Sequence, residues 1–312
     1  MSHSPHIVGL GEALFDVFEN GREVVGGAPL NFAVHANRLA RVVGKSVAIV
    51  SRVGADARGE AVGAFLESAG MTGEFLQKDA EHATGTVQVR LDVGGQPSYE
   101  IVRDVAWDFL QGNSELDALA EQCELVCYGS LAQRSERSRE TIEAFVVRAK
   151  RAVRLFDVNL RQSFYDYSTL RRGCALATAL KVNAEELGVL ASMLTLRGTS
   201  PGDRVLSLFE RFPIEVVILT RGSEGTAIYT PTGKFEGPQV SYPLEAGADS
   251  VGAGDAATAA AAVAMLAGHS LDQVVNIANH AGAFVASRHG ATPELPGEIL
   301  RMMDRRVTPD AG

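Results

Sequence analysis

The sequence predicts an α/β protein in which a mainly parallel central sheet is covered by helices on both faces. Three observations indicate this fold class. From Leu116 onward, short apolar runs alternate with longer helical patterns, which is typical of parallel strands joined by helices. Forty-six per cent of the 312 residues are hydrophobic, enough for a substantial core. Polar residues gather directly after several predicted strands, where open parallel sheets bind their ligands.

The amino-terminal third is expected to contain strands, helices and an exposed hairpin. Residues 7–18 have the pattern of a strand, and strict alternation would place Glu12 and Asp16 on one face, which therefore is not simply core. Pro29 suits the first turn of a helix that runs to about Val42. The other expected elements are a strand at 46–53, a helix at 57–69, and a hairpin of 86–92 with 98–103 around residues 94–97, a candidate lid.

The remaining two thirds alternate helix and strand and then end in helices. Strands are expected at residues 124–128, 153–158, 178–182 and 215–220, with a short β segment at 225–241. Helices are expected at residues 114–122, 135–150, 168–176, 184–191, 202–211, 254–267, 271–287 and 297–304. Neither a repeat nor a clear domain boundary interrupts this order, so residues 1–312 are interpreted as a single domain.

The composition argues against several classes of protein. The formal net charge is −9 and no long basic block is present, so we expect no nucleic-acid binding. Three cysteines are too few for a disulfide framework and lack the spacing of a metal site, so we interpret them as thiols in a reducing cytoplasm. Neither an export signal nor an apolar stretch of about 20 residues is indicated.

The segment 249–256 (DSVGAGDA) carries the strongest functional signal. Gly252 and Gly254 flank Ala253, so the backbone can turn tightly and leave its N–H groups free at the start of an alanine-rich helix. This arrangement predicts an anion pocket. An acid beside a bound phosphate suits a base that deprotonates the attacking group, so Asp255 is the candidate general base.

Two other interpretations of this segment stay open from the sequence. Asp255 also has the position of an ordinary N-cap, which would stabilise its helix by about 1 kcal/mol. The series from Gly252 to Ala257 also fits the dinucleotide fingerprint G-x-G-x-x-G/A, which would indicate an NAD-dependent oxidoreductase. That fingerprint requires a strand after the helix, whereas a second helix is expected here.

Polar residues follow two of the predicted parallel strands. Asp157, Asn159 and Arg161 alternate beyond one strand and can point into one crevice, where Arg161 would balance phosphate charge. A solvated ion-pair face is the competing interpretation. Asn183 and Glu186 lie three apart at a helix start and suit Mg²⁺, which leans on one or two carboxylates plus phosphate. A capping box fits their spacing equally well.

Two further pairs suit the partners of a phosphoryl transfer. Thr220 and Gly222 offer a hydroxyl and an N–H to phosphate oxygens, although an ordinary turn has the same composition. Asp16 and Asn31 offer hydrogen bonds to hydroxyl groups, although each also suits a turn or cap. Transfer to a hydroxyl needs a base, an anion clamp, a metal and exclusion of water, and each has a candidate in this chain.

Two separate segments resemble the signatures of the ribokinase family of ATP-dependent carbohydrate kinases, which includes bacterial fructokinases. The amino-terminal signature is similar to residues 26–33 (GGAPLNFA) and the carboxy-terminal one to residues 249–256. They occur in the order of the family, and the resemblance covers nearly the whole chain. It implies a three-layer α/β/α fold with a small β-sheet lid formed by residues 12–25 and 86–103.

The resemblance also implies roles for individual residues. Asp255 would be the base, with the N–H groups of Gly252, Ala253 and Gly254 as the anion pocket. The sugar contacts would be Asp16, Gly27, Asn31, Arg103 and Arg161. The residues for ATP and Mg²⁺ would be Asn183, Glu186, Thr220, Gly222, Gly225 and, near the adenine, Asn279. Binding of a monovalent cation such as K⁺ near residues 249–250 and 288–291 stays open, as does a homodimer formed through the lid.

We therefore expect a cytoplasmic kinase that uses ATP and Mg²⁺ to phosphorylate a primary hydroxyl of a small sugar, fructose first. Ribose, a nucleoside or 2-keto-3-deoxygluconate are alternative acceptors on the same fold, and a sugar acid would need a dedicated cation such as Arg103. From other classes, an NAD-dependent oxidoreductase and a sugar-binding protein without catalysis are the competing hypotheses. Ala257 stands where the family usually has an aromatic residue.

Overall fold

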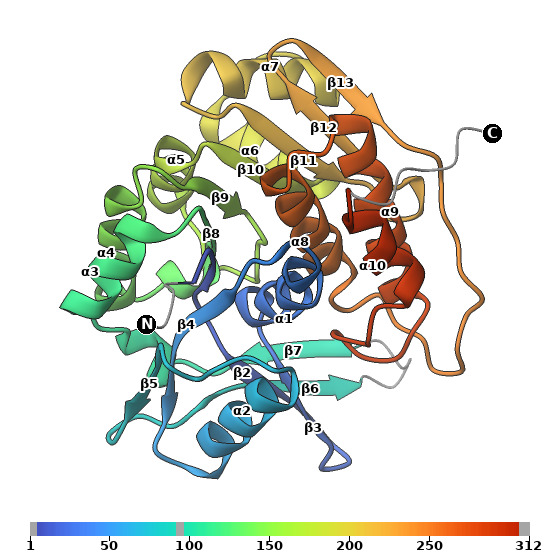
Figure 1. The fold of residues 1–312 in the computed structure, drawn as a ribbon. Coiled ribbons are helices and arrows are strands. Elements are labelled where there is room, and N and C mark those ends of the chain that lie inside the picture. The colour runs from blue at the N-terminus through green and yellow to red at the C-terminus, as the bar shows by residue number, and fades with distance from the viewer. Residues whose placement is uncertain (1–4, 92–96, 306–312) are drawn as a thin grey trace.

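The computed structural model describes residues 5–91 and 97–305, and a large central sheet organises it (Figure 1). Within the described residues this sheet has nine strands in the order β13-β12-β11-β10-β9-β8-β1-β4-β5. Its strands are β1 (Ile7–Leu10), β4 (Val47–Gly54), β5 (Leu76–Asp79), β8 (Leu125–Gly129), β9 (Val153–Asp157), β10 (Ala179–Asn183), β11 (Val216–Thr220), β12 (Thr226–Thr230) and β13 (Gly233–Glu236). All neighbours pair in parallel except β11 with β12 and β12 with β13, so the predicted mainly parallel sheet is confirmed.

Helices cover both faces of this sheet. They are α1 (Ala28–Ala40), α2 (Ala57–Ser68), α3 (Ser114–Gln122), α4 (Glu136–Arg148), α5 (Tyr167–Leu176), α6 (Ala184–Leu194), α7 (Pro201–Arg211), α8 (Ala253–Leu266), α9 (Leu271–Ala286) and α10 (Gly297–Met303). Because successive side chains of a strand point to opposite faces, Ile7 packs in one buried cluster with α1 and α8, and Val8 packs in the other with α3 to α7. The predicted three-layer arrangement is therefore confirmed.

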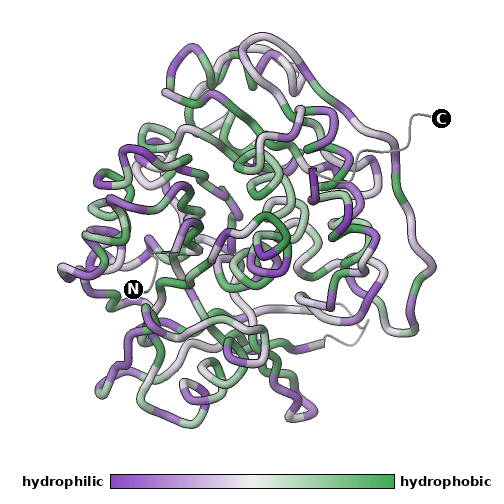
Figure 2. Tube along the Cα trace, viewed as in Figure 1, coloured by the Kyte–Doolittle hydropathy of each residue, from purple (hydrophilic) through white to green (hydrophobic). Residues whose placement is uncertain are grey.

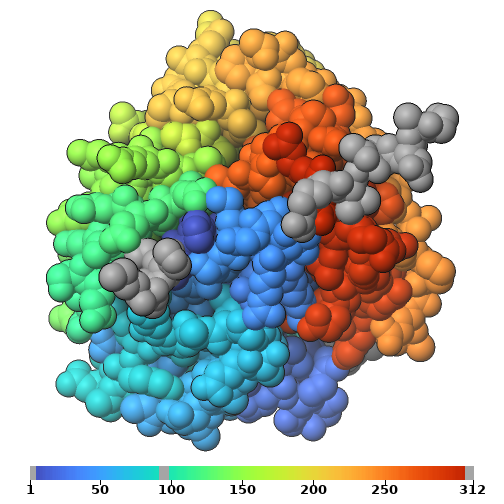
Figure 3. All heavy atoms as spheres, viewed as in Figure 1, coloured from blue at the N-terminus to red at the C-terminus, as the bar shows by residue number. Residues whose placement is uncertain are grey.

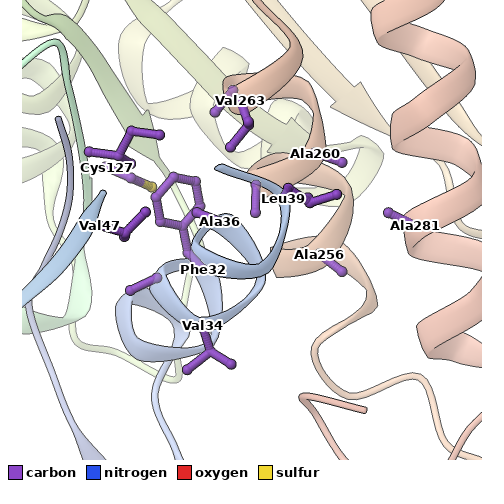
Figure 4. Packing of buried hydrophobic residues seen from close by; sticks show 14 of the residues in the cluster. Phe32, Val34, Ala36, Leu39, Val47, Cys127, Ala256, Ala260, Val263 and Ala281 are labelled. Carbon is purple, nitrogen blue, oxygen red and sulfur yellow. The ribbon is translucent and has the colours of Figure 1, made fainter. Parts of the chain in front are cut away.

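Small side chains allow the helices of one layer to approach closely. Leu39 of α1 lies near Ala260 of α8, and Phe32 of α1 lies toward Cys127 and Val47 of the sheet, as Figure 4 shows. Every residue of α8 from Ala256 to Ala264 is buried, which explains why this helix is apolar on all sides. Figure 2 shows the same view coloured by hydropathy, with hydrophobic residues in green. In the space-filling view of Figure 3, α1 (blue) adjoins the carboxy-terminal helices (red). Within the described ranges, no helix has the length and apolarity required to cross a lipid bilayer.

A second, smaller sheet lies beside the first and matches the segments predicted to form a lid. Its order is β3-β2-β6-β7, with bounds β2 (Leu14–Phe18), β3 (Glu23–Gly26), β6 (Gly85–Leu91) and β7 (Pro97–Ile101). The predicted turn at 94–97 lies almost wholly outside the described residues. Closure of this sheet as a lid stays a prediction.

The expected single strand at 7–18 is wrong, because the structure divides it into β1 and β2, which belong to different sheets. The break falls at residues 11–13, where Gly11 has a φ of 150° and a Cβ would lie 2.8 Å from the Pro29 side chain. Glu12 therefore sits at the carboxyl end of β1 instead of within a strand. The strand pattern did not predict β3 or β5 as separate strands, and the segment 225–241 contains two strands, β12 and β13.

Candidate active site

The predicted anion pocket lies at the amino-terminal end of α8. Gly252 is the N-cap, with a φ of 77°, and a Cβ there would lie 2.2 Å from the carbonyl oxygen of Ala291, so only glycine fits. Among the described residues, the N–H groups of Gly252 and Gly254 have no acceptor. The N–H of Ala253 donates to Ser250 O at 3.3 Å, so two of the three predicted groups are free for an anion.

Asp255 lies in the first turn of α8, where its carboxylate meets α1. Asn31 Nδ2 donates to Asp255 Oδ2 at 2.9 Å. Burial, followed by the negative charge of Asp157, raises the pKa of Asp255 to about 6, against the opposing effects of Lys181, Asn31 and Arg161. The N-cap interpretation is wrong, because Gly252 holds that position and no side chain caps this helix.

A cluster of buried charges lies under the start of α8. Lys181 Nζ and Asp157 Oδ1 are 3.0 Å apart, and their side chains are 6% and 7% exposed. Glu12 is 2% exposed, and its Oε2 has no hydrogen-bond partner in the described structure. Burial, opposed by its own backbone N–H and by Arg161, raises the pKa of Glu12 to about 7.

Sequence reasoning missed both Lys181 and Glu12 as site residues. The available signal for Lys181 was a charged residue inside an apolar strand, two positions before Asn183. In the parallel register of β9 and β10 it stands directly opposite Asp157. For Glu12 the signal was an acidic residue directly after a buried strand, but the sequence pattern placed Glu12 inside a longer strand at residues 7–18. Neither signal reveals burial, which depends on α8 covering these strand ends.

Asn183 and Glu186 form the capping box that the sequence left open. Asn183 N donates to Glu186 Oε2 and Glu186 N donates to Asn183 Oδ1, both at 2.8 Å. Glu186 Oε1 also accepts from Leu160 N at 3.2 Å. Each oxygen of the carboxylate keeps a further lone pair, and a carboxylate together with phosphate oxygens is the donor set that Mg²⁺ prefers. Glu186 therefore fits a role in holding Mg²⁺ or its waters in addition to its role in capping.

A cavity of about 470 Å³ opens between the carboxyl end of β11 and the helices α8 and α9. It brings together four of the residues predicted for ATP, Thr220, Gly222, Gly225 and Asn279, with Gly254 of the predicted anion pocket. Asn279 is 5% exposed, and its amide is already engaged, because Oδ1 accepts from Thr226 N at 2.7 Å and Nδ2 donates to Pro238 O at 3.0 Å. Its amide therefore shapes the cavity wall next to Gly225.

The predicted sugar residues Asp16, Gly27 and Asn31 connect to Asp255 through Asn31, which donates to its carboxylate, and through Arg161, whose charge acts on both Asp16 and Asp255. Gly27 has a φ of 113°, and a Cβ there would lie 2.5 Å from Glu12 O. Any other residue at this position would therefore clash with the backbone of Glu12. Burial raises the pKa of Asp16, and the nearby Arg161 opposes that shift. These residues therefore share one region with Glu12 and Arg161.

Arg103 lies apart from that group. Its guanidinium stands 4.7 Å from the centre of the Phe164 ring, and it lines a smaller cavity of about 180 Å³ with Arg134 and Arg139. In the described part of the chain no hydrogen bond or ion pair joins it to Asp16 or Arg161. Among the described residues, the structure thus places Arg103 with Phe164 and Arg134, and its predicted contact with the sugar stays a prediction.

The two segments predicted to flank a monovalent cation meet in the structure. Asp249 N donates to Arg288 O at 3.1 Å, and Gly290 N donates to Asp249 Oδ2 at 3.3 Å. They lie directly beside the anion pocket, because Ala291 O is the atom that excludes a side chain at Gly252. Binding of a cation between them stays a prediction.

Comparisons with known proteins agree with this fold. The model of the pfkB family carbohydrate kinases matches residues 16–297. The fructokinase of Vibrio alginolyticus is 32% identical over 296 residues, which cover 89% of this chain and 91% of that protein. The ATP complex of a sugar kinase from Pyrococcus horikoshii is 26% identical with a TM-score of 0.77, covering 95% of this chain and 99% of that one. A fructokinase double mutant from Vibrio cholerae, solved with fructose, ADP and potassium ion, is 24% identical with a TM-score of 0.78, covering 97% and 99%.

The fold and the site therefore define a phosphotransferase that acts on a sugar hydroxyl. The chain belongs to the pfkB family of carbohydrate kinases. The resemblance predicted from the two signature segments is confirmed. The oxidoreductase interpretation is wrong, because α8 is followed by α9 and not by the strand that a dinucleotide fingerprint requires.

Proposed function

We propose that this protein transfers the γ-phosphate of ATP to a primary hydroxyl of a small sugar, with fructose as the leading acceptor. One observation carries the proposal: Asp255 directly follows Gly254, which lines the 470 Å³ cavity with a free N–H group, and its carboxylate accepts a hydrogen bond from Asn31, one of the predicted sugar residues. A nucleotide on one side and an alcohol on the other would both reach it. The fructokinase of Vibrio alginolyticus and the ATP-bound Pyrococcus horikoshii kinase support these two substrates.

The proposed reaction uses groups that the chain provides. Asp255 accepts the proton of the attacking hydroxyl while the oxygen bonds to the γ-phosphorus and the bond to ADP breaks. The N–H groups of Gly252 and Gly254, together with the positive end of the α8 dipole, stabilise charge on the transferred group. Mg²⁺, held with the help of Glu186, would neutralise phosphate charge. Since Asp255 must be ionised, kcat/KM should fall as the pH drops through about 6.

The decisive experiment is a panel of sugars and nucleosides scored for ADP release by the purified protein and by Asp255→Asn. We expect fructose to give the highest kcat/KM, and the substitution to lower turnover by at least about 10² while ATP still binds. Asp272→Asn is the matched control, because it makes the same change in the first turn of α9 at an exposed position. ATP and sugar binding without ADP release would instead support a binding protein.

The identity of the acceptor can be narrowed at Arg103. A sugar acid such as 2-keto-3-deoxygluconate would need a cation for its carboxylate, and Arg103 is the predicted candidate, an exposed guanidinium that lines the smaller cavity. With a neutral sugar as acceptor, we expect Arg103→Ala to change the kcat/KM for fructose only a few-fold. A loss of more than about 10² that is confined to acidic sugars would reassign the acceptor.

We also propose a cytoplasmic location and a homodimer formed through the smaller sheet. Free, buried thiols at Cys123, Cys127 and Cys174 are typical of a reducing compartment. The smaller sheet has β3 and β7 at its edges, and Tyr99 of β7 is 53% exposed, as an edge that pairs with a second copy would be. Sedimentation of the protein and of Tyr99→Lys tests the dimer, which the charge at this edge should weaken.

A further inference from the structure

A buried ion pair lies at the carboxyl ends of β9 and β10, and the proposed reaction gives it no part. Lys181 and Asp157 stand opposite each other in the parallel register, 3.0 Å apart and almost without exposure. Burying two charges costs free energy that their attraction often fails to repay. Apolar side chains occupy most of the neighbouring positions on this face, as in Leu155 and Ala179. The pair therefore needs an explanation other than stability of the core.

Both side chains point toward the helix that carries the candidate base. Leu155 and Ala179 belong to the buried cluster under α1 and α8, and Asp157 and Lys181 follow two residues later on the same faces of their strands. A Cβ on Gly254 would lie only 3.7 Å from Lys181 Nζ. The ammonium therefore reaches the first turn of α8, beside the residue that precedes Asp255.

Resting on the proposed function, we propose that Lys181 and Asp157 are positioning residues that set the protonation of Asp255 with opposite signs. The ammonium of Lys181 favours the ionised base, and the carboxylate of Asp157 disfavours it. Held together as a pair, they keep the base ionised near neutral pH and still basic enough to take a proton from an alcohol. Neither side chain needs to touch a substrate for this role.

The charges around these groups are consistent with that balance. Burial disfavours the ammonium of Lys181, but Asp157, Glu186 and Asp255 outweigh burial, so the pKa of Lys181 lies above its ordinary value and its charge is permanent. Asp255 is also faced by Asn31 from α1 and by Arg161 from the loop after β9, and Glu12 at the end of β1 couples to it. A neighbouring charge moves a carboxyl pKa by roughly one to three units, enough to decide protonation near pH 6.

The first test follows the acidic limb of kcat/KM against pH, which reports the free enzyme. Asp157→Asn removes a like charge, so we expect the midpoint to fall by about one pH unit. Lys181→Met should raise it, by less, because the unpaired Asp157 will itself bind a proton more readily. Lys181→Arg preserves the charge and should keep the midpoint. The double variant Asp157→Asn with Lys181→Met should return toward the wild-type midpoint.

A merely structural pair would lower kcat or the melting temperature of these variants without moving the midpoint, or would move it in one direction for both. Either result overturns the inference. A midpoint of kcat/KM that rises in Asp157→Asn would also overturn the inference. Thermal melts of each variant identify those that fail to fold, and only folded variants enter the comparison.

A second measurement does not depend on catalysis. In protein labelled with ¹³C at the aspartate carboxyl carbons, the Asp255 signal is identified by its absence in Asp255→Asn and then titrated in each folded variant. This also separates Asp255 from Glu12, whose pKa is raised to about 7. If no sugar gives ADP release, the proposed function fails, and the Asp255 titration still decides the inference: unchanged midpoints in Asp157→Asn would reject it.

Discussion

The nucleotide-side cavity and the charged cluster meet at Asp255, yet they are built from different groups. Glycine and alanine, including Gly222, Gly225 and Ala257, make up about half of the cavity lining, and none of the lining residues is charged. The cluster consists of ionisable side chains that α8 and the strand ends keep from water, such as Lys181 and Asp157. Backbone groups do not titrate, whereas buried carboxylates respond to every neighbouring charge. We therefore expect substitutions in the cavity to act through its shape, and substitutions in the charged cluster to change the pH dependence of activity.

Ala257 illustrates how the cavity side depends on small residues. It is 4% exposed and lines the cavity, and a Cβ on Gly282 of α9 would lie 3.2 Å from its own Cβ. The close approach of α8 and α9 therefore replaces the aromatic side chain that the family usually has at this position. The departure noted in the sequence therefore falls at the cavity wall, where α8 and α9 approach closely.

The largest expected effect is on the backbone side. Gly252→Val should lower kcat/KM by about 10² or more, because a side chain at a φ of 77° and 2.2 Å from Ala291 O must displace the anion pocket. Gly44→Val is the matched control, since its φ is 69° and nothing lies within 4 Å of its Cβ. Steady-state kinetics and thermal melts of both variants make the comparison. Equal losses of activity in the two would contradict a specific role for Gly252.

An intermediate effect is expected for Asn31, a neutral residue that donates a hydrogen bond to Asp255 within the charged cluster. Asn31→Ala removes the hydrogen bond that favours ionised Asp255, so the acidic limb of kcat/KM should move up by about one pH unit. Activity at pH 6 should then fall roughly fivefold, with a smaller loss at pH 8. Asn37→Ala is the control, because Asn37 also lies on α1 and its amide donates a hydrogen bond to Ala69 O, away from Asp255. An unmoved midpoint would show that Asn31 serves only the sugar.

The smallest expected effect is the loss of one hydroxyl from the cavity side. Thr220→Val keeps the shape of the side chain and should raise the KM for ATP about two- to tenfold, the range of one hydrogen bond. The KM for the sugar and the pH profile should not change, because Thr220 lines only the nucleotide-side cavity. Thr230→Val on β12 provides the control. A change in the sugar KM would mean that the two sides are not separable.

The sequence alone determined the α/β class, the alternation of strands and helices from Leu116 onward, and the position of the candidate base. These follow from local rules: periodicity of apolar residues, and glycines at Gly252 and Gly254 that leave N–H groups free. It could not distinguish a capping box from a metal ligand at Asn183 and Glu186, because both need the same spacing. The structure shows the capping box and leaves room for the metal.

Only the tertiary structure decided which charges are buried together. Glu12, Asp157 and Lys181 are separated by up to 169 positions in the sequence, and each taken alone has the pattern of a turn or strand end. Packing of α1 and α8 across one face of the sheet removes water from them and brings them to Asp255. Burial and proximity belong to the assembled layers, and for that reason the pKa of the base could be read only from the folded chain.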